Sequence, residues 1–215
     1  MSKYDTILFD FDGTVMDTNN VIIQSWQHTF RTLRNKEQDV EKIISTFGEP
    51  LETTIKYLFP DIPTQEAVEV YRSYHYDNFG ELIDVFPGVR ELLRELKNRD
   101  YKVGLVTSRL RKTTMQGLEK YELASYFDVI VTADDTTKHK PDPEPINIAL
   151  KRLGSLPETS MMLGDTMFDM RCAKNAGVDP VLVGWALAVT EEEKNGPDGP
   201  KFTIERAEDL LDLIG

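Results

Sequence analysis

Cysteine is nearly absent from this 215-residue chain, since Cys172 is the only one. One cysteine excludes a disulfide within the chain and suits a reducing compartment, so we expect a cytoplasmic protein. Long apolar runs are also missing, and Asp10 cuts short the run near the N-terminus. The sequence therefore predicts neither a signal peptide nor a membrane-spanning helix.

An excess of positive charge is also absent, because 37 acidic residues outnumber 25 basic ones and the formal net charge is −12. This balance argues against nucleic acids and anionic membranes as general partners. It leaves room for a small anionic substrate, because a metal ion and a few local cations can reverse the field inside one cleft. We find no internal repeat and no low-complexity segment, and we expect a monomer or a weak dimer.

The remaining composition is ordinary for a soluble globular protein, with 40% hydrophobic and 29% charged residues. The length allows a substantial core in one or two domains.

Short apolar runs alternate with helical patterns after about residue 85, which predicts a parallel sheet covered by helices on both faces. The expected strands are Thr6–Phe9, Lys102–Val106, Val129–Thr132, Ser160–Leu163 and Pro180–Val183, with an edge strand at Lys201–Ile204. The expected helices are Val89–Arg99, Pro143–Leu153, Met167–Ala176 and Ala207–Leu213. Asp142 is the expected N-cap of the second helix, with Pro143 at its first position.

Residues 15–84 interrupt this alternation with an almost wholly helical segment. We expect a helical cap domain over 15–84 and a catalytic core over 1–14 plus 85–215. The expected cap helices are Asp17–Leu33, Val40–Phe47, Leu51–Leu58 and Gln65–Phe79.

Asp10 and Asp12 directly follow the first strand, and residues two apart on a strand point to the same side. Two crowded carboxylates repel each other, which raises the pKa of one unless a cation intervenes. The pair suits a divalent metal ion, a nucleophile or a general acid, although a helix N-cap and turn would also use these residues. An EF-hand calcium loop is excluded, because its sixth and twelfth positions hold Val15 and Val21.

Two further strand ends carry groups that can hold an anion. Thr107 and Ser108 follow a strand and could bind phosphate with a hydroxyl and backbone N–H groups, or could simply cap a helix. Lys140 is stiffened by Pro141 and could reach over a strand end, whereas the ordinary interpretation is a solvated lysine. Lys138 is its competitor.

Asp165 and Asp169 follow the strand at Ser160–Leu163 and lie one helical turn apart, so both can face one point. The plain structural alternative places Asp165 as an N-cap and Asp169 in the first helical turn.

Taken together, these groups occur in the order Asp-x-Asp, Thr/Ser, Lys and Gly-Asp-x-x-x-Asp, each after a different strand. On these motifs the chain resembles the haloacid dehalogenase superfamily over essentially its whole length. The resemblance implies a doubly wound, Rossmann-like α/β core with an inserted all-helical cap, and a hydrolase acting on phosphate compounds.

The resemblance also implies the role of each motif in catalysis. Asp10 would attack phosphorus to form an aspartyl-phosphate, and Asp12 would serve as the acid and base. Thr107, its neighbouring amides and Lys140 would cradle the transferring phosphoryl group.

A Mg²⁺ cofactor is part of the same implication. Asp10, the backbone carbonyl of Asp12 and Asp165 would hold the ion, with Asp169 as an outer or water-mediated ligand. Carboxylate, carbonyl and phosphate oxygens are what magnesium prefers.

Details within the superfamily narrow the expected function. Asp12 argues against a haloacid dehalogenase proper, and Thr14 stands where β-phosphoglucomutases usually carry valine. Phosphonatases use a buried lysine of the cap, and no sequence feature marks a lysine of this cap segment as buried. The segments Lys140–Pro145, Gly48–Leu51 and Val183–Trp185 most resemble phosphoglycolate phosphatases and related pyrophosphatases.

We therefore expect a Mg²⁺-dependent phosphatase acting on a phosphoglycolate-like ester or on pyrophosphate. The alternatives are a β-phosphoglucomutase-type phosphosugar mutase and a non-catalytic binding module. Substrate choice is expected in the cap, where Gly48 opens a loop that could meet the substrate. Arg109 is a candidate for a second anionic group of the substrate, or else a surface arginine.

Overall fold

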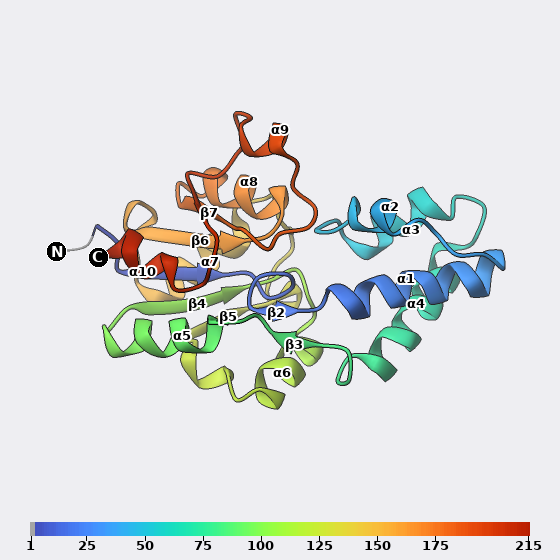
Figure 1. The fold of residues 1–215 in the computed structure, drawn as a ribbon, viewed down its shortest axis with the longest axis horizontal. Helices are drawn as coiled ribbons and strands as arrows, with labels where there is room; N and C mark the ends of the chain where they lie inside the picture. The colour runs from blue at the N-terminus through green and yellow to red at the C-terminus, as the bar shows by residue number, and fades with distance from the viewer. Residues whose placement is uncertain (1–2) are drawn as a thin grey trace. The chain divides into compact units, whose positions relative to one another are not determined.

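The computed structural model describes residues 3–215 (Figure 1). The chain forms two compact units. The core unit contains the described residues up to Asp17 together with Val85–Gly215, and the helical unit contains Thr18–Asp84.

Within the described residues, the core unit has a six-stranded sheet in the order β5-β4-β1-β6-β7-β8. Every paired strand in it is parallel. Its strands are β1 (Thr6–Phe9), β4 (Lys102–Val106), β5 (Val129–Val131), β6 (Ser160–Gly164), β7 (Asp179–Val183) and β8 (Phe202–Ile204). This is the doubly wound Rossmann order, so the predicted α/β fold is confirmed.

The strand order reverses between β1 and β6, because the chain builds one half of the sheet before it returns to build the other. In sheets of this type, ligands bind at such a switch point, beyond the carboxyl ends of the strands. The residues after β1 and β6 are Asp10 and Asp165.

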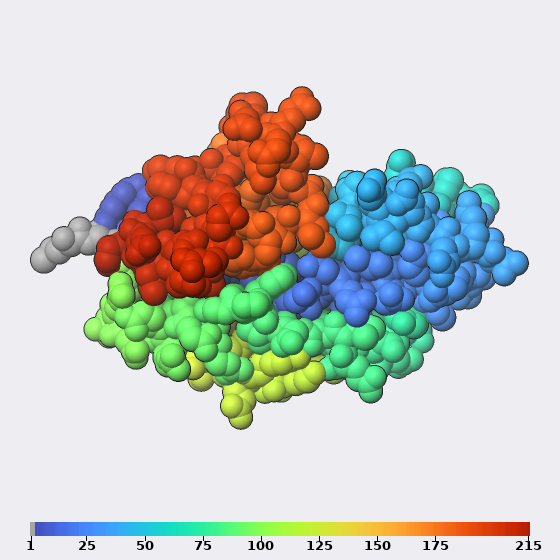
Figure 2. Space-filling model, viewed as in Figure 1, coloured from blue at the N-terminus to red at the C-terminus, as the bar shows by residue number. Residues whose placement is uncertain are grey.

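Helices connect the strands of the core unit. They are α5 (Val89–Asn98), α6 (Arg111–Lys120), α7 (Glu144–Leu153), α8 (Met167–Asn175), α9 (Glu191–Lys194) and α10 (Asp209–Ile214). Short 3₁₀ turns lie at Ala124–Tyr126, Ala133–Asp135 and Pro157–Thr159. The C-terminal part of the chain, coloured orange to red, covers much of the visible face of this unit (Figure 2). Helix α9 projects from it (Figure 1).

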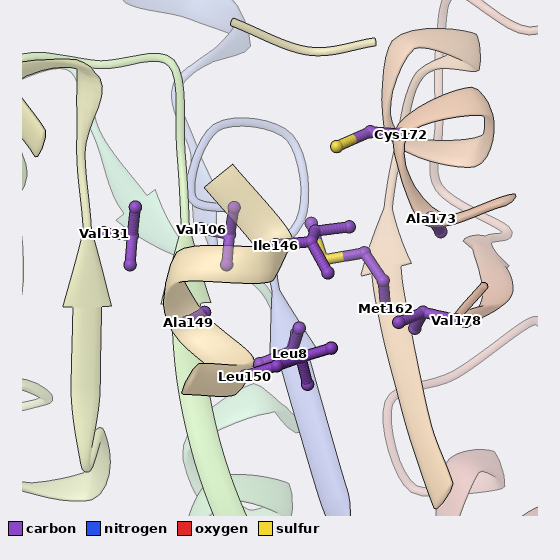
Figure 3. Close-up of a cluster of buried hydrophobic side chains, with 10 residues drawn as sticks. All are labelled: Leu8, Val106, Val131, Ile146, Ala149, Leu150, Met162, Cys172, Ala173 and Val178. Atoms are coloured by element: carbon purple, nitrogen blue, oxygen red, sulfur yellow. The ribbon is translucent and has the colours of Figure 1, made fainter. Parts of the chain in front are cut away.

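A hydrophobic cluster joins the sheet to α7 and α8 (Figure 3). Leu8, Val106 and Met162 come from three adjacent strands, and Ile146 and Leu150 come from α7. Cys172 of α8 also belongs to this cluster and is fully buried, and burial raises the pKa of its thiol to about 12. The thiol is therefore a packing group.

Helix ends show which sequence signals the structure follows. Thr190 and Glu193 form the capping box of α9, and Gly177 follows α8 with a φ of 73°, which are common signals for a helix start and a helix end. The start of α7 differs, because Pro143 is its cap residue and the helix begins at Glu144. Asp142 still accepts a hydrogen bond from the backbone N–H of Glu144 (2.9 Å).

Helix α6 was not predicted, and its composition explains why. Its buried positions include Thr113, Thr114 and Gly117, so it lacks the apolar stripe that marks an amphipathic helix. The two-residue strands β2 (Met16–Asp17) and β3 (Asp84–Val85), which pair in a separate sheet, were also too short to predict.

The helical unit consists of α1 (Asn19–Arg34), α2 (Val40–Ile44), α3 (Leu51–Leu58) and α4 (Thr64–Asn78). Only α2 is clearly shorter than expected, because it ends at Ile44 rather than at Phe47. Aromatic and aliphatic side chains pack together in its interior, where the rings of Phe30 and Phe59 lie 4.6 Å apart.

Among the described helices, none combines the length and the apolar character that crossing a membrane would require.

Replacement of Leu8 by alanine tests the cluster under α7. Leu8 is fully buried, so Leu8→Ala should lower the free energy of unfolding by about 2–5 kcal/mol, through lost transfer energy and a cavity. Leu156→Ala is the control, because Leu156 is 58% exposed and its loss should change stability by less than about 0.5 kcal/mol. Urea unfolding measures both, and equal losses would contradict the packing described.

Candidate active site

The carboxyl ends of β1 and β6 place two aspartates side by side. The two strands pair in register, with Phe9 opposite Leu163. The backbone N–H of Asp10 donates to the carbonyl of Leu163 (2.9 Å), which continues the pairing one residue beyond β1. Asp165 follows β6 directly, and both aspartates are buried. The switch point of the sheet is therefore lined by carboxylates.

Lys140 lies between two of the buried carboxylates. Its Nζ donates to Asp10 Oδ1 (2.7 Å) and to Asp169 Oδ1 (2.6 Å), and the residue is only 6% exposed. Lys138, the competitor suggested by the sequence, is exposed and pairs with Asp142 instead. The lysine preceding Pro141 is thus the one that enters the site.

Asp169 is held from its other side by the start of α8. Its Oδ2 accepts from the backbone N–H of Thr166 (3.1 Å) and from the Thr166 hydroxyl (2.6 Å). Thr166 is therefore the N-cap, in a capping box with Asp169, and the alternative that made Asp165 the cap is wrong. Both carboxylate oxygens of Asp169 are engaged, whereas Asp165 accepts no hydrogen bond from the described residues.

Asp10, Asp165 and Asp169 form an acid cluster, with one oxygen of each within 4.8 Å of the others. When all three are ionised, Lys140 balances only one of their charges, and two negative charges remain. A divalent cation fits that deficit, and hard oxygen donors are the ligands that Mg²⁺ prefers. The donor set therefore fits a divalent cation such as Mg²⁺, which Asp10 and Asp165 could hold.

The cluster shifts the proton affinity of its members. Burial raises the pKa of Asp10 to about 7; Lys140 opposes the shift, and Asp169 and Asp12 add to it. Burial also raises the pKa of Asp165 well above its usual range, with further contributions from Asp169, Asp10 and Asp12. Burial lowers the pKa of Lys140, but the Asp10 and Asp169 carboxylates outweigh it, so this pKa is raised. Lys140 is therefore charged.

Two glycines leave the space that the acid cluster occupies. Gly13 has a φ of 68°, and a Cβ there would lie under 3.0 Å from the Asp165 carboxylate. A Cβ at Gly164 would collide with the Asp169 side chain in the same way. The close approach of the carboxylates thus depends on the absence of side chains at both positions.

Asp12 lies outside the acid cluster, paired with Arg109. The guanidinium Nη2 donates to Asp12 Oδ1 (2.7 Å), and Nε donates to Oδ2 (3.0 Å) and Oδ1 (3.2 Å). The side chain of Arg109 is 9% exposed and that of Asp12 is 28% exposed. Sequence reasoning selected both residues but missed their pairing, because no spacing rule links positions 97 residues apart.

The remaining predicted residues occupy different surroundings. Thr107 is buried, its N–H donates to Val131 (3.0 Å), and its Oγ1 accepts from the N–H of Arg109 (3.1 Å). It does not cap a helix, since α6 begins at Arg111. Ser108, the next residue, is exposed. Gly48 belongs to the helical unit, where it is exposed and has a φ of 86°.

Comparisons with known proteins agree on one group. The family model described as haloacid dehalogenase-like hydrolase matches residues 7–183. Pyrophosphatase PpaX of Halalkalibacterium halodurans is 36% identical over 213 residues, which is 99% of this chain and 98% of that protein.

Solved structures lead to the same group. A haloacid dehalogenase-like hydrolase from Streptococcus pneumoniae superposes with a TM-score of 0.89 at 26% identity, covering 100% of both chains. A protein assigned as a phosphoglycolate phosphatase from Lactobacillus plantarum gives 0.85 at 25% identity, covering 99% of this chain and 100% of that one. The resemblance inferred from the motifs is confirmed, as is the expectation of an enzyme of the phosphatase type.

Alanine at Gly13 tests the space beside Asp165. Gly13→Ala should reduce phosphate release from an aryl phosphate by about a hundredfold, because the new Cβ displaces the Asp165 carboxylate. Gly154→Ala is the matched control, since Gly154 has a φ of 61° but no atom within 4 Å of the added Cβ. Both variants carry a backbone strain of about 1 kcal/mol. A comparable loss of activity in Gly154→Ala would refute the steric explanation.

The raised pKa values of Asp10 and Asp165 predict how Mg²⁺ should stabilise the protein. Between about pH 4 and pH 7 these two carboxyl groups bind more protons in the metal-free folded state than in the unfolded chain, so their contribution to stability falls as pH rises. A bound Mg²⁺ ion would offset this loss by taking the place of the protons. The increase in melting temperature on adding Mg²⁺ should therefore grow from about pH 5 to about pH 8.

Melting curves with Mg²⁺ and with a chelator measure this increment. Asp165→Asn serves as the control, because removal of one charge should reduce both the increment and its pH dependence. An increment that is the same at both ends of the pH range would contradict the assignment.

Proposed function

Because the chain belongs to the haloacid dehalogenase-like hydrolase family, we propose that it is a Mg²⁺-dependent phosphatase that works through an aspartyl-phosphate. The observation that carries this proposal is the acid cluster with Lys140 at the switch point of the sheet. Hydrolysis of a phosphate ester or anhydride needs a nucleophile, compensating positive charge and a proton donor in one place. Asp10, Lys140 and Asp12 supply these three functions in the proposal.

Asp10 is the proposed nucleophile. One of its oxygens would bond to phosphorus while the bond between phosphorus and the leaving oxygen breaks, and Asp12 would give a proton to that oxygen. The contact from Lys140 supports this role, because it fixes the Asp10 carboxylate and brings positive charge close to the incoming phosphoryl group. Thr107, two residues before Arg109, is the proposed hydroxyl contact of that group, with Ser108 beside it.

Asp10, Asp165 and the backbone carbonyl of Asp12 are the proposed ligands of Mg²⁺. Members of this family use a divalent metal ion. When bound, the ion would neutralise negative charge on the phosphoryl oxygens. Asp169 is better suited to an outer position, because Lys140 and Thr166 already engage both of its oxygens. Its role in the proposal is to orient Lys140.

Inorganic pyrophosphate and small phosphomonoesters such as phosphoglycolate are the proposed substrates. A relative that is 36% identical across nearly the whole chain is named a pyrophosphatase, and a structural neighbour is assigned as a phosphoglycolate phosphatase. Gly48 and its loop in the helical unit are proposed to contribute to the choice between substrates.

Replacement of the nucleophile tests the proposed function. Asp10→Asn should reduce phosphate release by at least about a thousandfold, since a carboxamide cannot form the acyl-phosphate. Phosphate release should be measured with Mg²⁺, with a chelator, and with pyrophosphate, phosphoglycolate, hexose phosphates and an aryl phosphate as substrates. Asp5→Asn is the matched control, because Asp5 is exposed and lies outside the acid cluster.

Two outcomes would overturn the proposal. Turnover that is equal in wild type and Asp10→Asn would exclude the aspartyl-phosphate route. Conversion of a hexose phosphate to its isomer without release of free phosphate would favour the mutase alternative.

A further inference from the structure

The ion pair between Arg109 and Asp12 is more extensive than a surface contact. Nε and Nη2 of the guanidinium donate hydrogen bonds to both carboxylate oxygens, at distances from 2.7 to 3.2 Å. Fork-shaped pairing of this kind fixes the orientation of a carboxylate as well as its position.

The backbone of Arg109 is also fixed on both sides. Its N–H donates to Thr107 Oγ1 (3.1 Å), and its carbonyl accepts from the N–H of Ala133 (3.0 Å). The guanidinium carbon lies 5.6 Å from the centroid of the Phe11 ring, within cation–π range. Arg111, two residues later, differs, because its side chain is 44% exposed. Arg109 is thus held in place by neighbours on three separate segments of the core unit.

We propose, resting on the proposed function, that Arg109 is a positioning residue that holds Asp12 as an oriented carboxylate for the second half-reaction. In that half-reaction Asp12 takes a proton from a water molecule, and the water oxygen bonds to phosphorus. The bond between phosphorus and Asp10 breaks, and its electron pair returns to the Asp10 carboxylate. The products are inorganic phosphate, ionised Asp10 and protonated Asp12.

The geometry favours the base step over the acid step. Both oxygens of Asp12 accept N–H groups from the positively charged Arg109, and that arrangement favours the ionised carboxylate, which offers only acceptors. The observed pair therefore matches the form of Asp12 that removes a proton from water. Giving a proton to a leaving group requires a different arrangement of the pair.

The rival explanation is that Arg109 leaves Asp12 and binds a second anionic group of the substrate. The two explanations differ in what they predict for an aryl phosphate that has a good leaving group and no anionic group besides its phosphate. Such a substrate has no second anion, and its leaving group needs little help from an acid. Only the positioning role predicts a defect with it, and only in decay of the phosphoenzyme.

Rapid-quench kinetics on the full-length protein with Mg²⁺ and p-nitrophenyl phosphate separates the two steps. In Arg109→Met the rate constant for decay of the phosphoenzyme should fall by roughly tenfold to a hundredfold. Its rate constant of formation should change by less than about twofold, so phosphate accumulates on Asp10. Arg109→Lys keeps the charge without the fork and should show an intermediate decay rate. Arg111→Met is the matched control and should decay like wild type.

A double-mutant cycle asks whether Arg109 acts through Asp12. In an Asp12→Asn background, Arg109→Met should slow decay of the phosphoenzyme no further, because the group that it positions is gone. Full additivity of the two effects would overturn the inference. A rise in KM confined to substrates with a second anionic group, with normal decay, would overturn it in favour of the rival.

Melting curves establish that each variant is folded, and Arg109→Lys carries the test if Arg109→Met does not fold. Failure of the inference can be told from failure of the proposed function. Wild type that turns over through Asp10, with unchanged decay in both Arg109 variants, overturns the inference alone. Wild type that forms no phosphoenzyme overturns both.

Discussion

The buried ammonium of Lys140 is the contact on which the rest of the site depends. It joins the end of β1, the loop before α7 and the first turn of α8, through hydrogen bonds to Asp10 and Asp169. Buried charges are tolerated only when they are paired, and removal of one partner typically costs about 3–5 kcal/mol. The three segments are therefore mutually dependent. Their arrangement follows from the sheet order, which brings the ends of β1 and β6 together.

Lys140 neutralises only part of the charge that the fold gathers. Gly13 and Gly164 allow Asp165 and Asp169 to approach the backbone more closely than a side chain would permit, so the repulsion among the carboxylates is built into the packing. A metal ion bound there would relieve a repulsion that depends on the absence of side chains at Gly13 and Gly164. Stability without metal and affinity for metal are two consequences of the same geometry.

Much of the core could be predicted because it follows from local patterns. Apolar runs predict the strands, and parallel strands end at one edge, so Asp10, Lys140, Asp165 and Asp169 were expected together. The capping role of Thr166 and the pairing of Arg109 with Asp12 depend on which of several nearby partners a side chain selects. Helix α6 escaped prediction because its buried face carries threonine and glycine. The proposed catalytic role of each residue stays a prediction that kinetics must test.

The two aspartates after β1 differ because their surroundings differ, and mutual repulsion is the smaller part of that difference. Two charges about 4 Å apart repel by roughly 4 kcal/mol at an effective dielectric of 20, so repulsion alone could have separated their behaviour. Burial is instead the largest influence on the pKa of Asp10, and Asp12 contributes less than Lys140 and Asp169. Each aspartate also has its own cation, Lys140 for Asp10 and Arg109 for Asp12. A buried carboxylate within the acid cluster and a half-buried one beside a guanidinium are suited to different tasks. The Asp-x-Asp spacing therefore brings the two groups to the same edge, and the two cations give each carboxylate the surroundings that its proposed role needs.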